Sequence, residues 1–240
     1  MLDAWWPTGD PRAALVVVVH GGFWRDGVDR THTGEECAAL AADGFVVAAI
    51  EYRRSGGAGG WPATLDDVRA ALDAAPSLVA GAAPEGVAVP TDRVVLVGHS
   101  AGGHLVGWAV GGGRVPTGVV AAISLGGVLD LAVAYDLRLG DDGRSSAVEA
   151  LLGGSPSDVP ERYAAADPAR LGAPGVPVLV LQGGRDDVVP PAVGDAYAAA
   201  SGQEQLLLPD AEHMDLVDPS SAAWPEVIAS VRRAAAEAGK

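Results

Sequence analysis

Residues 94–102 read VVLVGHSAG, from Val94 to Gly102. The first four are branched apolar residues, which is typical of a strand buried on both faces of a sheet. The last five form the pattern G-x-S-x-G, in which the chain turns sharply from a strand into a helix and exposes a serine hydroxyl at the turn. An apolar helical stretch follows, up to Val110. This context predicts Ser100 as a nucleophile.

The pentapeptide alone is a weak signal, because a chain with 33 glycines matches it by chance. Similar apolar runs recur, however, and alternate with Ala-rich stretches. We expect strands at 15–19, 45–50, 94–97, 119–124, 178–182 and 205–208, and helices at 33–42, 64–74, 101–110, 190–201 and 219–236. Such alternation predicts an α/β fold with a mostly parallel, doubly wound sheet flanked by helices.

The chain reads as a single domain over residues 1–240, since open α/β folds of this length form one unit and no second boundary is visible. The segment 128–171 is longer than one crossover between parallel strands requires. It predicts a small lid-like insertion.

Composition restricts the partners and the location. The chain has 31 acidic and 16 basic residues, a formal net charge of −15, which disfavours nucleic acid and anionic membranes as partners. A single cysteine, Cys37, rules out an internal disulfide. The N-terminus lacks the apolar run of a signal peptide, and the run 15–19 is too short to span a bilayer. We therefore expect a cytoplasmic protein that does not associate with membranes.

A serine nucleophile needs a base and an acid to orient that base. When the serine follows a strand of such a sheet, the partners follow later strands in the order acid, then histidine. Only His213 lies downstream of the helix that follows Ser100, directly after the last expected strand, and it is predicted to be the base. Asp186 and Asp187 both follow the strand at 178–182, and their positions do not choose between them.

The reaction also needs two backbone N–H groups that stabilise a developing oxyanion. One is predicted to come from Ala101, at the start of the helix. The second is expected from the loop after the strand at 15–19, which reads His20-Gly21-Gly22-Phe23-Trp24. The glycine pair lets this backbone approach a substrate oxygen closely.

Together these motifs resemble the α/β-hydrolase family, and within it a branch of small esterases and kynurenine formamidase-like proteins. The resemblance is carried by HGGFW at 20–24 and GHSAGGHL at 98–105 and extends over nearly the whole chain from Leu15 onward. It implies that Asp186 is the acid, through the pattern G-x-x-D-x-x-V-P at 183–190. It also implies an oxyanion hole formed by Gly21, Gly22 and Ala101, with the Phe23 amide as a further contributor, and a short antiparallel strand at 2–6.

Other polar and aromatic residues receive secondary interpretations. His20, His99 and His104 lack the spacing of a metal site, and no metal is predicted. The run Glu51-Tyr52-Arg53-Arg54 is interpreted as an ion-pair cluster that anchors loops rather than as pocket lining. Phe23, Trp24 and Trp61 are predicted to line the substrate pocket, with core or rim packing as an equal alternative for Trp24 and Trp61.

The sequence thus predicts a serine hydrolase that cleaves a small carboxylic ester, short-chain or aryl, through an acyl-enzyme intermediate and without any cofactor. Its partner is expected to be a small-molecule ester or amide. The first alternative is an arylformamidase that hydrolyses an N-formylkynurenine-type amide. A ligand-binding protein of the same fold without activity is the second.

Overall fold

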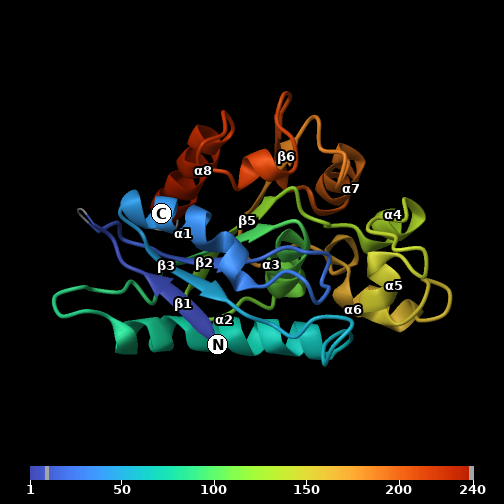
Figure 1. Cartoon of the computed structure of the whole chain (residues 1–240), viewed down its shortest axis with the longest axis horizontal. Coiled ribbons are helices and arrows are strands. Elements are labelled where there is room, and N and C mark those ends of the chain that lie inside the picture. The colour runs from blue at the N-terminus through green and yellow to red at the C-terminus, as the bar shows by residue number, and fades with distance from the viewer. Residues whose placement is uncertain (9–10, 238–240) are drawn as a thin grey trace.

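The computed structural model describes residues 1–8 and 11–237. Within these ranges the strands form one seven-stranded sheet in the order β1-β3-β2-β4-β5-β6-β7, as Figure 1 shows. The strands are β1 (Leu2–Trp5), β2 (Leu15–Val19), β3 (Val46–Ile50), β4 (Val94–His99), β5 (Val119–Leu125), β6 (Val178–Gly183) and β7 (Glu204–Leu208). Only β1 runs antiparallel to its neighbour, β3, in this described sheet. The predicted mostly parallel sheet is confirmed.

Helices cover both faces of the sheet, which is why its central strands are apolar throughout. One face packs against α2 (Ala63–Ala82), α3 (Ala101–Val110) and α7 (Pro191–Ser201). The other packs against α1 (Gly34–Ala42) and α8 (Trp224–Glu237). Alternate residues of β2 and β4 enter the two cores, so that Val17 and Leu96 lie on one side and Val16 and Val95 on the other. The doubly wound arrangement is therefore confirmed.

Two helix boundaries differ from the predictions by more than one residue. The predicted helix 64–74 continues to Ala82 through Pro76, because burial of Ala75 and Val79 on the sheet holds the second half in place although proline removes one helical hydrogen bond. The predicted helix 219–236 begins only at Trp224, and Pro225 rather than Pro219 occupies its first turn.

The segment between β5 and β6 contains three further helices, α4 (Leu131–Asp136), α5 (Ala147–Leu152) and α6 (Pro160–Ala166). They lie together at one end of the molecule in Figure 1. Their apolar side chains, including Leu131, Leu151 and Tyr163, join the core on the α3 side of the sheet. The helical segment lies where an insertion was predicted, at 128–171.

Parallel pairing brings the carboxyl ends of the strands to one edge of the sheet. Val19 at the end of β2 pairs with Gly98 of β4, and Gly183 at the end of β6 pairs with Leu208 of β7. The loops after β2, β4, β5, β6 and β7 therefore leave from the same edge. This is the edge where ligands bind in open α/β sheets.

The turn from β4 into α3 is unusually close-packed. A Cβ atom at Gly98 would overlap the carbonyl of Gly102, and a Cβ atom at Gly102 would overlap the carbonyl oxygen of Val19 in β2. The missing side chains let α3 begin directly against the end of the neighbouring strand. Both glycines of the pentapeptide are thus required by space.

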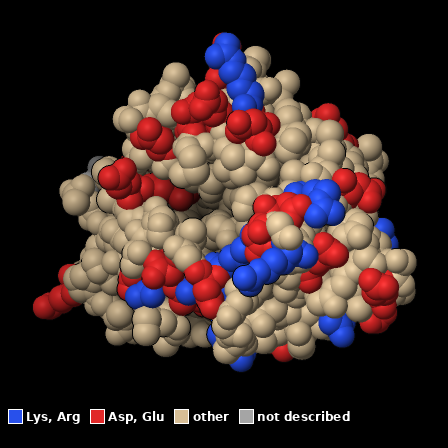
Figure 2. Space-filling model, turned by 45° about the vertical axis from the view of Figure 1, so that its right-hand side comes forward, with Lys and Arg blue, Asp and Glu red and all other residues tan. Residues whose placement is uncertain are grey.

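Arginines on the surface lie beside carboxylates, as Figure 2 shows for one face of the molecule, which is hollowed near its centre. Exposed pairs include Arg53 with Asp67 and Arg185 with Asp210. Each such pair contributes about 1 kcal/mol or less. Along the described ranges, every helix is too short or too polar to cross a membrane.

We predict that Gly102→Ala lowers the melting temperature by about 5 °C or more, because the added methyl group must displace the backbone of β2. The matched control is Gly81→Ala in α2, where a Cβ atom meets nothing within 4 Å. The melting temperature of Gly81→Ala should equal that of the wild type or exceed it by up to about 3 °C. Thermal unfolding followed by circular dichroism measures both, and equal melting temperatures would contradict the packing argument.

Candidate active site

Ser100 occupies the turn between β4 and α3 in a strained backbone conformation, with φ 55° and ψ −118°. Its N–H donates to the carbonyl of Leu125 at 2.9 Å, and its own carbonyl accepts from the N–H of His104 at 3.2 Å. Ala101 is the first residue of α3, so its N–H has no acceptor within the helix. The turn thus places Ser100 beside the positive end of a helix. The residue is 3% exposed.

His213 follows β7, and its Nδ1 lies 2.7 Å from Oδ2 of Asp186. Both side chains are buried, at 5% and 4% exposure. The other carboxylate oxygen of Asp186 accepts from the N–H groups of Val188 and Val189, at 3.0 and 2.7 Å. Asp187, by contrast, is exposed. The structure therefore brings Asp186, and not Asp187, to the histidine.

Gln182, at the end of β6, also touches this carboxylate. Its Nε2 donates to Oδ2 of Asp186 at 3.3 Å and to the carbonyl of Val189 at 3.1 Å. A carboxylate that accepts several hydrogen bonds is fixed in orientation. Gln182 thus supports Asp186 in its place opposite His213.

His99, the residue before the serine, supports the His213 loop. Its Nε2 lies 3.1 Å from the carbonyl oxygen of His213, and the two rings pack with centroids 4.4 Å apart. Burial, assisted by His213, lowers the pKa of His99 to about 3. The ring is therefore neutral, and its Nε2–H donates to that carbonyl.

Gly126 follows β5 and packs against His213 and Asp186. Its φ is 52°, and a Cβ atom there would lie 3.0 Å from Oδ2 of Asp186 and 3.2 Å from Nδ1 of His213. A side chain at this position would push against the hydrogen bond between them. The sequence analysis missed this residue, although its place after a strand in Ser124-Leu125-Gly126-Gly127 is a usable signal.

The loop after β2 lies directly against the serine turn. A Cβ atom at Gly21 would lie 3.1 Å from Cβ of Ser100. Gly22 has φ 103°, and a Cβ atom there would collide with Val28 at 2.5 Å. Glycine is therefore needed at Gly22, a side chain at Gly21 would be tightly packed, and the backbone of this loop lies against Ser100.

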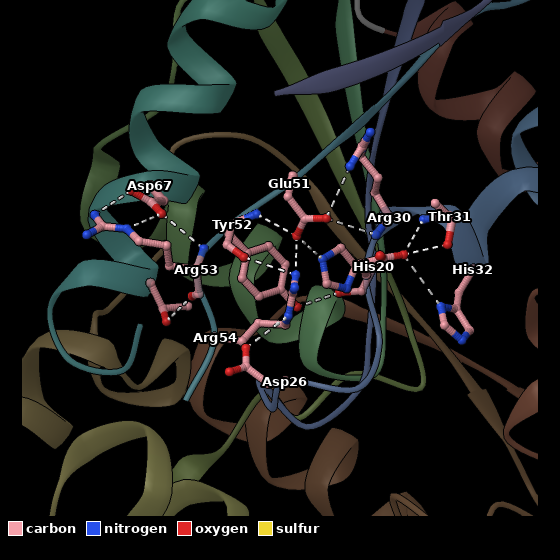
Figure 3. A network of polar contacts seen from close by, with 12 residues as sticks. His20, Asp26, Arg30, Thr31, His32, Glu51, Tyr52, Arg53, Arg54 and Asp67 are labelled. Carbon is pink, nitrogen blue, oxygen red and sulfur yellow. Dashed lines mark hydrogen bonds and ion pairs between the residues drawn. The ribbon is translucent and has the colours of Figure 1, made fainter. Parts of the chain in front are cut away.

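A polar network anchors the same loop from behind, as Figure 3 shows. His20 stacks on Tyr52 with ring centroids 4.2 Å apart, and its Nε2 lies 3.0 Å from Oε1 of Glu51. The Tyr52 hydroxyl donates to the carbonyl of His20 at 2.9 Å. Arg30 and Arg54 both pair with Glu51. The interpretation of this run as a loop-anchoring ion-pair cluster is confirmed.

Burial lowers the pKa of His20, while the Gly21 carbonyl and Glu51 act against that shift. Glu51 is held in the charged form: burial raises its pKa, but hydrogen bonds from the N–H groups of Arg30 and Tyr52, together with His20, outweigh burial and lower it overall. The anchor of the glycine loop is thus a half-buried carboxylate shared by a histidine and two arginines.

A cavity of about 290 Å³ opens beside Ser100 and His213. The loop after β2 contributes Gly21, Gly22 and Phe23. The segment around η1 (Arg30–Thr33) and α1 contributes further lining, as do the segment around η4 (Met214–Leu216) and the loop between β6 and α7. These walls include Val28, His32, Thr33, Glu36, Val188, Met214 and Val217. Ser100 therefore faces a small, mainly apolar space.

The three predicted pocket aromatics differ in position. Phe23 lines the cavity. Trp24 is fully buried, and its Nε1 donates to Nδ1 of His104 at 3.1 Å. Its assignment to the pocket was wrong, because a backbone with φ 57° turns the indole into the core. Trp61 packs against the core away from the cavity lining, so its assignment was wrong as well.

His104 is satisfied entirely by protein groups. Burial lowers its pKa to about 4, so the neutral ring accepts from Trp24 and donates through Nε2 to the carbonyl of Ala166 at 2.9 Å. Within the part of the chain that the structure describes, no three His, Cys, Asp or Glu side chains are grouped to hold a metal ion.

Comparison with known families identifies the chain. The BD-FAE family matches residues 2–200. The chain belongs to the BD-FAE family. The matched region includes Ser100, Asp186 and the glycine loop, whereas His213 lies beyond it. In this BD-FAE chain, His213 is therefore connected with the site by its contact with Asp186 and its place in the cavity beside Ser100, and not by the family match.

Solved structures resemble the BD-FAE chain over almost its full length. A truncated carbohydrate esterase from gut microbiota gives a TM-score of 0.81 at 19% identity, covering 98% of this chain and 90% of that one. Propionate-bound Est2, a thermophilic esterase of Thermogutta terrifontis, gives a TM-score of 0.72 at 23% identity, covering 99% of this chain and 89% of that one. Inhibited esterase B of Lactobacillus rhamnosis gives a TM-score of 0.75 at 19% identity, covering 99% of this chain and 81% of that one. The α/β-hydrolase fold is confirmed. A comparison with curated proteins found no match.

Glu36 is a cavity residue that the sequence analysis missed, since an acidic residue at the start of a helix is usually exposed. It is 3% exposed, and burial raises its pKa from 4.5 to about 8. The folded protein thus keeps a proton that the unfolded chain loses. Glu36 therefore reduces stability progressively as the pH rises from 4.5 to about 8.

We predict that Glu36→Gln, which has no proton to lose, melts above the wild type at alkaline pH. The melting temperature of Glu36→Gln minus that of the wild type should be larger at about pH 8.5 than at about pH 5.5, by roughly 5 °C or more. Glu35→Gln is the control, because the neighbouring Glu35 is exposed. A gap for Glu36→Gln that does not change with pH would contradict the raised pKa.

Proposed function

We propose that this BD-FAE family member is a serine hydrolase that cleaves small carboxylic esters, short-chain or aryl, through an acyl-enzyme intermediate. The observation that carries the proposal is the 2.7 Å contact between His213 Nδ1 and Asp186 Oδ2, beside the strained Ser100 turn and in the same cavity. The printed descriptions of the structural neighbours support it, since they name esterases.

In the proposed acylation step, Nε2 of His213 removes the proton of Ser100 while Oγ attacks the ester carbonyl carbon. The Nδ1–H of His213 donates to Asp186, which stabilises the positive charge on the ring. The N–H groups of Gly22 and Ala101 stabilise the oxyanion, with Gly21 giving the loop its close approach. His213 then protonates the leaving alcohol, and the carbonyl bond forms again as the acyl-enzyme.

In the proposed deacylation step, His213 removes a proton from water as the water attacks the acyl carbon. The same amides stabilise the second oxyanion, and the proton returns to Ser100 as the carboxylic acid leaves. Side chains and backbone amides supply every group that these steps need, so the proposal requires no metal or organic cofactor.

The cavity supports a compact substrate. Its volume of about 290 Å³ lies at the lower end of small-molecule sites. Val28, Val188 and Val217 contribute apolar side chains, which favour a short acyl or aryl group. Est2 of Thermogutta terrifontis has been solved with propionate and with butyrate bound, two acids of this size class.

We predict that the wild type hydrolyses p-nitrophenyl acetate or butyrate faster than longer acyl esters and faster than N-formylkynurenine. Ser100→Ala should lower kcat by about 10⁵-fold or more, because no other group replaces the nucleophile. Release of p-nitrophenol and of formate measures the two activities. Turnover that survives Ser100→Ala would overturn the mechanism, and faster release of formate would favour the arylformamidase alternative.

We predict that Asp186→Asn lowers kcat by about 10³-fold or more, because the amide no longer stabilises the protonated His213 ring. Asp187→Asn is the matched control, because this neighbour is exposed, and it should stay within about twofold of the wild type. Steady-state kinetics on the best ester distinguishes them. The reverse order of effects would assign the acid to Asp187.

We predict that Glu51→Gln lowers kcat/KM by about tenfold or more, because His20 loses its charged partner and the glycine loop loses its fixed position. Asp67→Asn is the control, since the pair of Asp67 with Arg53 is exposed and does not touch that loop. Its kcat/KM should remain within about twofold of the wild-type value. Equal rates for the two variants would remove the loop-anchoring role of Glu51.

A further inference from the structure

One carboxyl group in the cavity has no part in the proposed chemistry. Glu36 belongs to α1 and lines the same space as Ser100 and His213. It is 3% exposed. Among the described residues its Oε1 has no hydrogen-bond partner.

The polar side chains next to Glu36 are engaged with one another. The Thr33 hydroxyl donates to the carbonyl of Arg30 at 2.8 Å, and the Cys37 thiol donates to the Thr33 hydroxyl at 3.5 Å. The cavity residues Val28 and Val217 have apolar side chains, and His32, which also lines the cavity, is exposed and lies 3.9 Å from the carboxylate of Asp29. Glu36 therefore presents a polar group to a space that otherwise favours apolar ligands.

A buried polar group without a partner costs about 1–3 kcal/mol in the folded protein. An apolar side chain of similar size would avoid this cost and would extend the wall formed by Val28 and Val217. The geometry thus resembles a binding site whose polar contact is completed by a ligand. A ligand group that reaches Glu36 would satisfy the carboxyl and offset the cost.

We infer that Glu36 is a specificity-determining residue that hydrogen-bonds a hydroxyl group on the part of the ester occupying this cavity. The inference rests on the proposed function and names a substrate class for it: small esters that carry a hydroxyl group away from the scissile bond.

A hydroxyl group fits better than a charged group. Burial raises the pKa of Glu36 to about 8, so at neutral pH the carboxyl is protonated and offers one donor and one acceptor. A hydroxyl group matches both. An ammonium group would need the ionised form, which burial disfavours, and a carboxylate would be unfavourable in a protein with a net charge of −15.

The cavity limits the size of this group. Its volume of about 290 Å³ equals that of roughly ten water molecules in the liquid. The group between the scissile bond and the hydroxyl is therefore a short chain or one ring. Sites built to hydrogen-bond a substrate hydroxyl discriminate strongly against the analogue that lacks it, because the polar group of the protein is then left unpaired.

The test uses esters matched in pairs that differ by one terminal hydroxyl. On the acyl side these are methyl alkanoates and methyl ω-hydroxyalkanoates, and on the alcohol side alkyl acetates and diol monoacetates, with chains of about two to six carbons to cover the reach of the cavity. In at least one pair the wild type should favour the hydroxylated ester by about tenfold or more in kcat/KM.

Glu36→Leu should reduce this ratio to about one, because leucine cannot hydrogen-bond. Glu36→Gln should keep most of it, because the amide retains a donor and an acceptor. Glu35→Leu, at the exposed neighbour, should leave the ratio unchanged. Glu36→Met provides a second apolar replacement, unbranched and flexible, if the leucine variant does not fold.

The outcomes separate this inference from the proposed function. If the wild type hydrolyses simple acetates in a Ser100-dependent manner but shows no hydroxyl preference, or keeps that preference in both apolar variants, the role of Glu36 is overturned and the hydrolase proposal stands. If the wild type hydrolyses none of the esters, both proposals fail.

Discussion

The contact on which the site depends is that between the first turn of α3 and the carboxyl end of β2. It exists because Gly98 and Gly102 have no side chains that would separate them. This contact fixes Ser100 at a positive φ, directs the N–H of Ala101 away from the helix and brings the glycine loop within van der Waals distance of the serine. The first turn of α3 and the glycine loop, from segments about eighty residues apart, are thereby held against each other, and the Glu51 network supports the loop from behind.

The histidine side of the site depends on different forces. His213 lies on a loop, and its position is set by hydrogen bonds: one from its ring to Asp186 and one to its carbonyl from the neutral His99. Burial keeps His99 uncharged. His99 therefore positions His213 without adding a second positive charge that would compete with the His213 ring for the Asp186 carboxylate. Residues flanking the serine and residues flanking the histidine therefore support each other across the site.

The sequence could predict what strong local signals determine. The strand at 15–19 and the helix at 101–110 were predicted with their observed bounds, since an uninterrupted apolar run and the serine turn specify them. Helix 64–74 was predicted too short because burial outweighed the effect of Pro76. The positions of Asp186 and Asp187 did not choose between them; the family resemblance favoured Asp186, and the structure gives the physical reason, which is its burial and its partners Val188 and Val189. The inward turn of Trp24 and the burial of Glu36 have no local signature in the sequence.

The hydrogen bonds that run from Trp24 through His104 to the carbonyl of Ala166 connect the glycine loop, α3 and the end of α6. Trp108, one turn further along α3, donates to the carbonyl of Ala165. Three segments distant in sequence thus share one buried set of partners. A change in one of them affects the partners of the others, whereas the wall formed by η1, α1 and η4 shares none of these bonds. Side chains on that wall can therefore be exchanged without disturbing the buried contacts that join the glycine loop to α3.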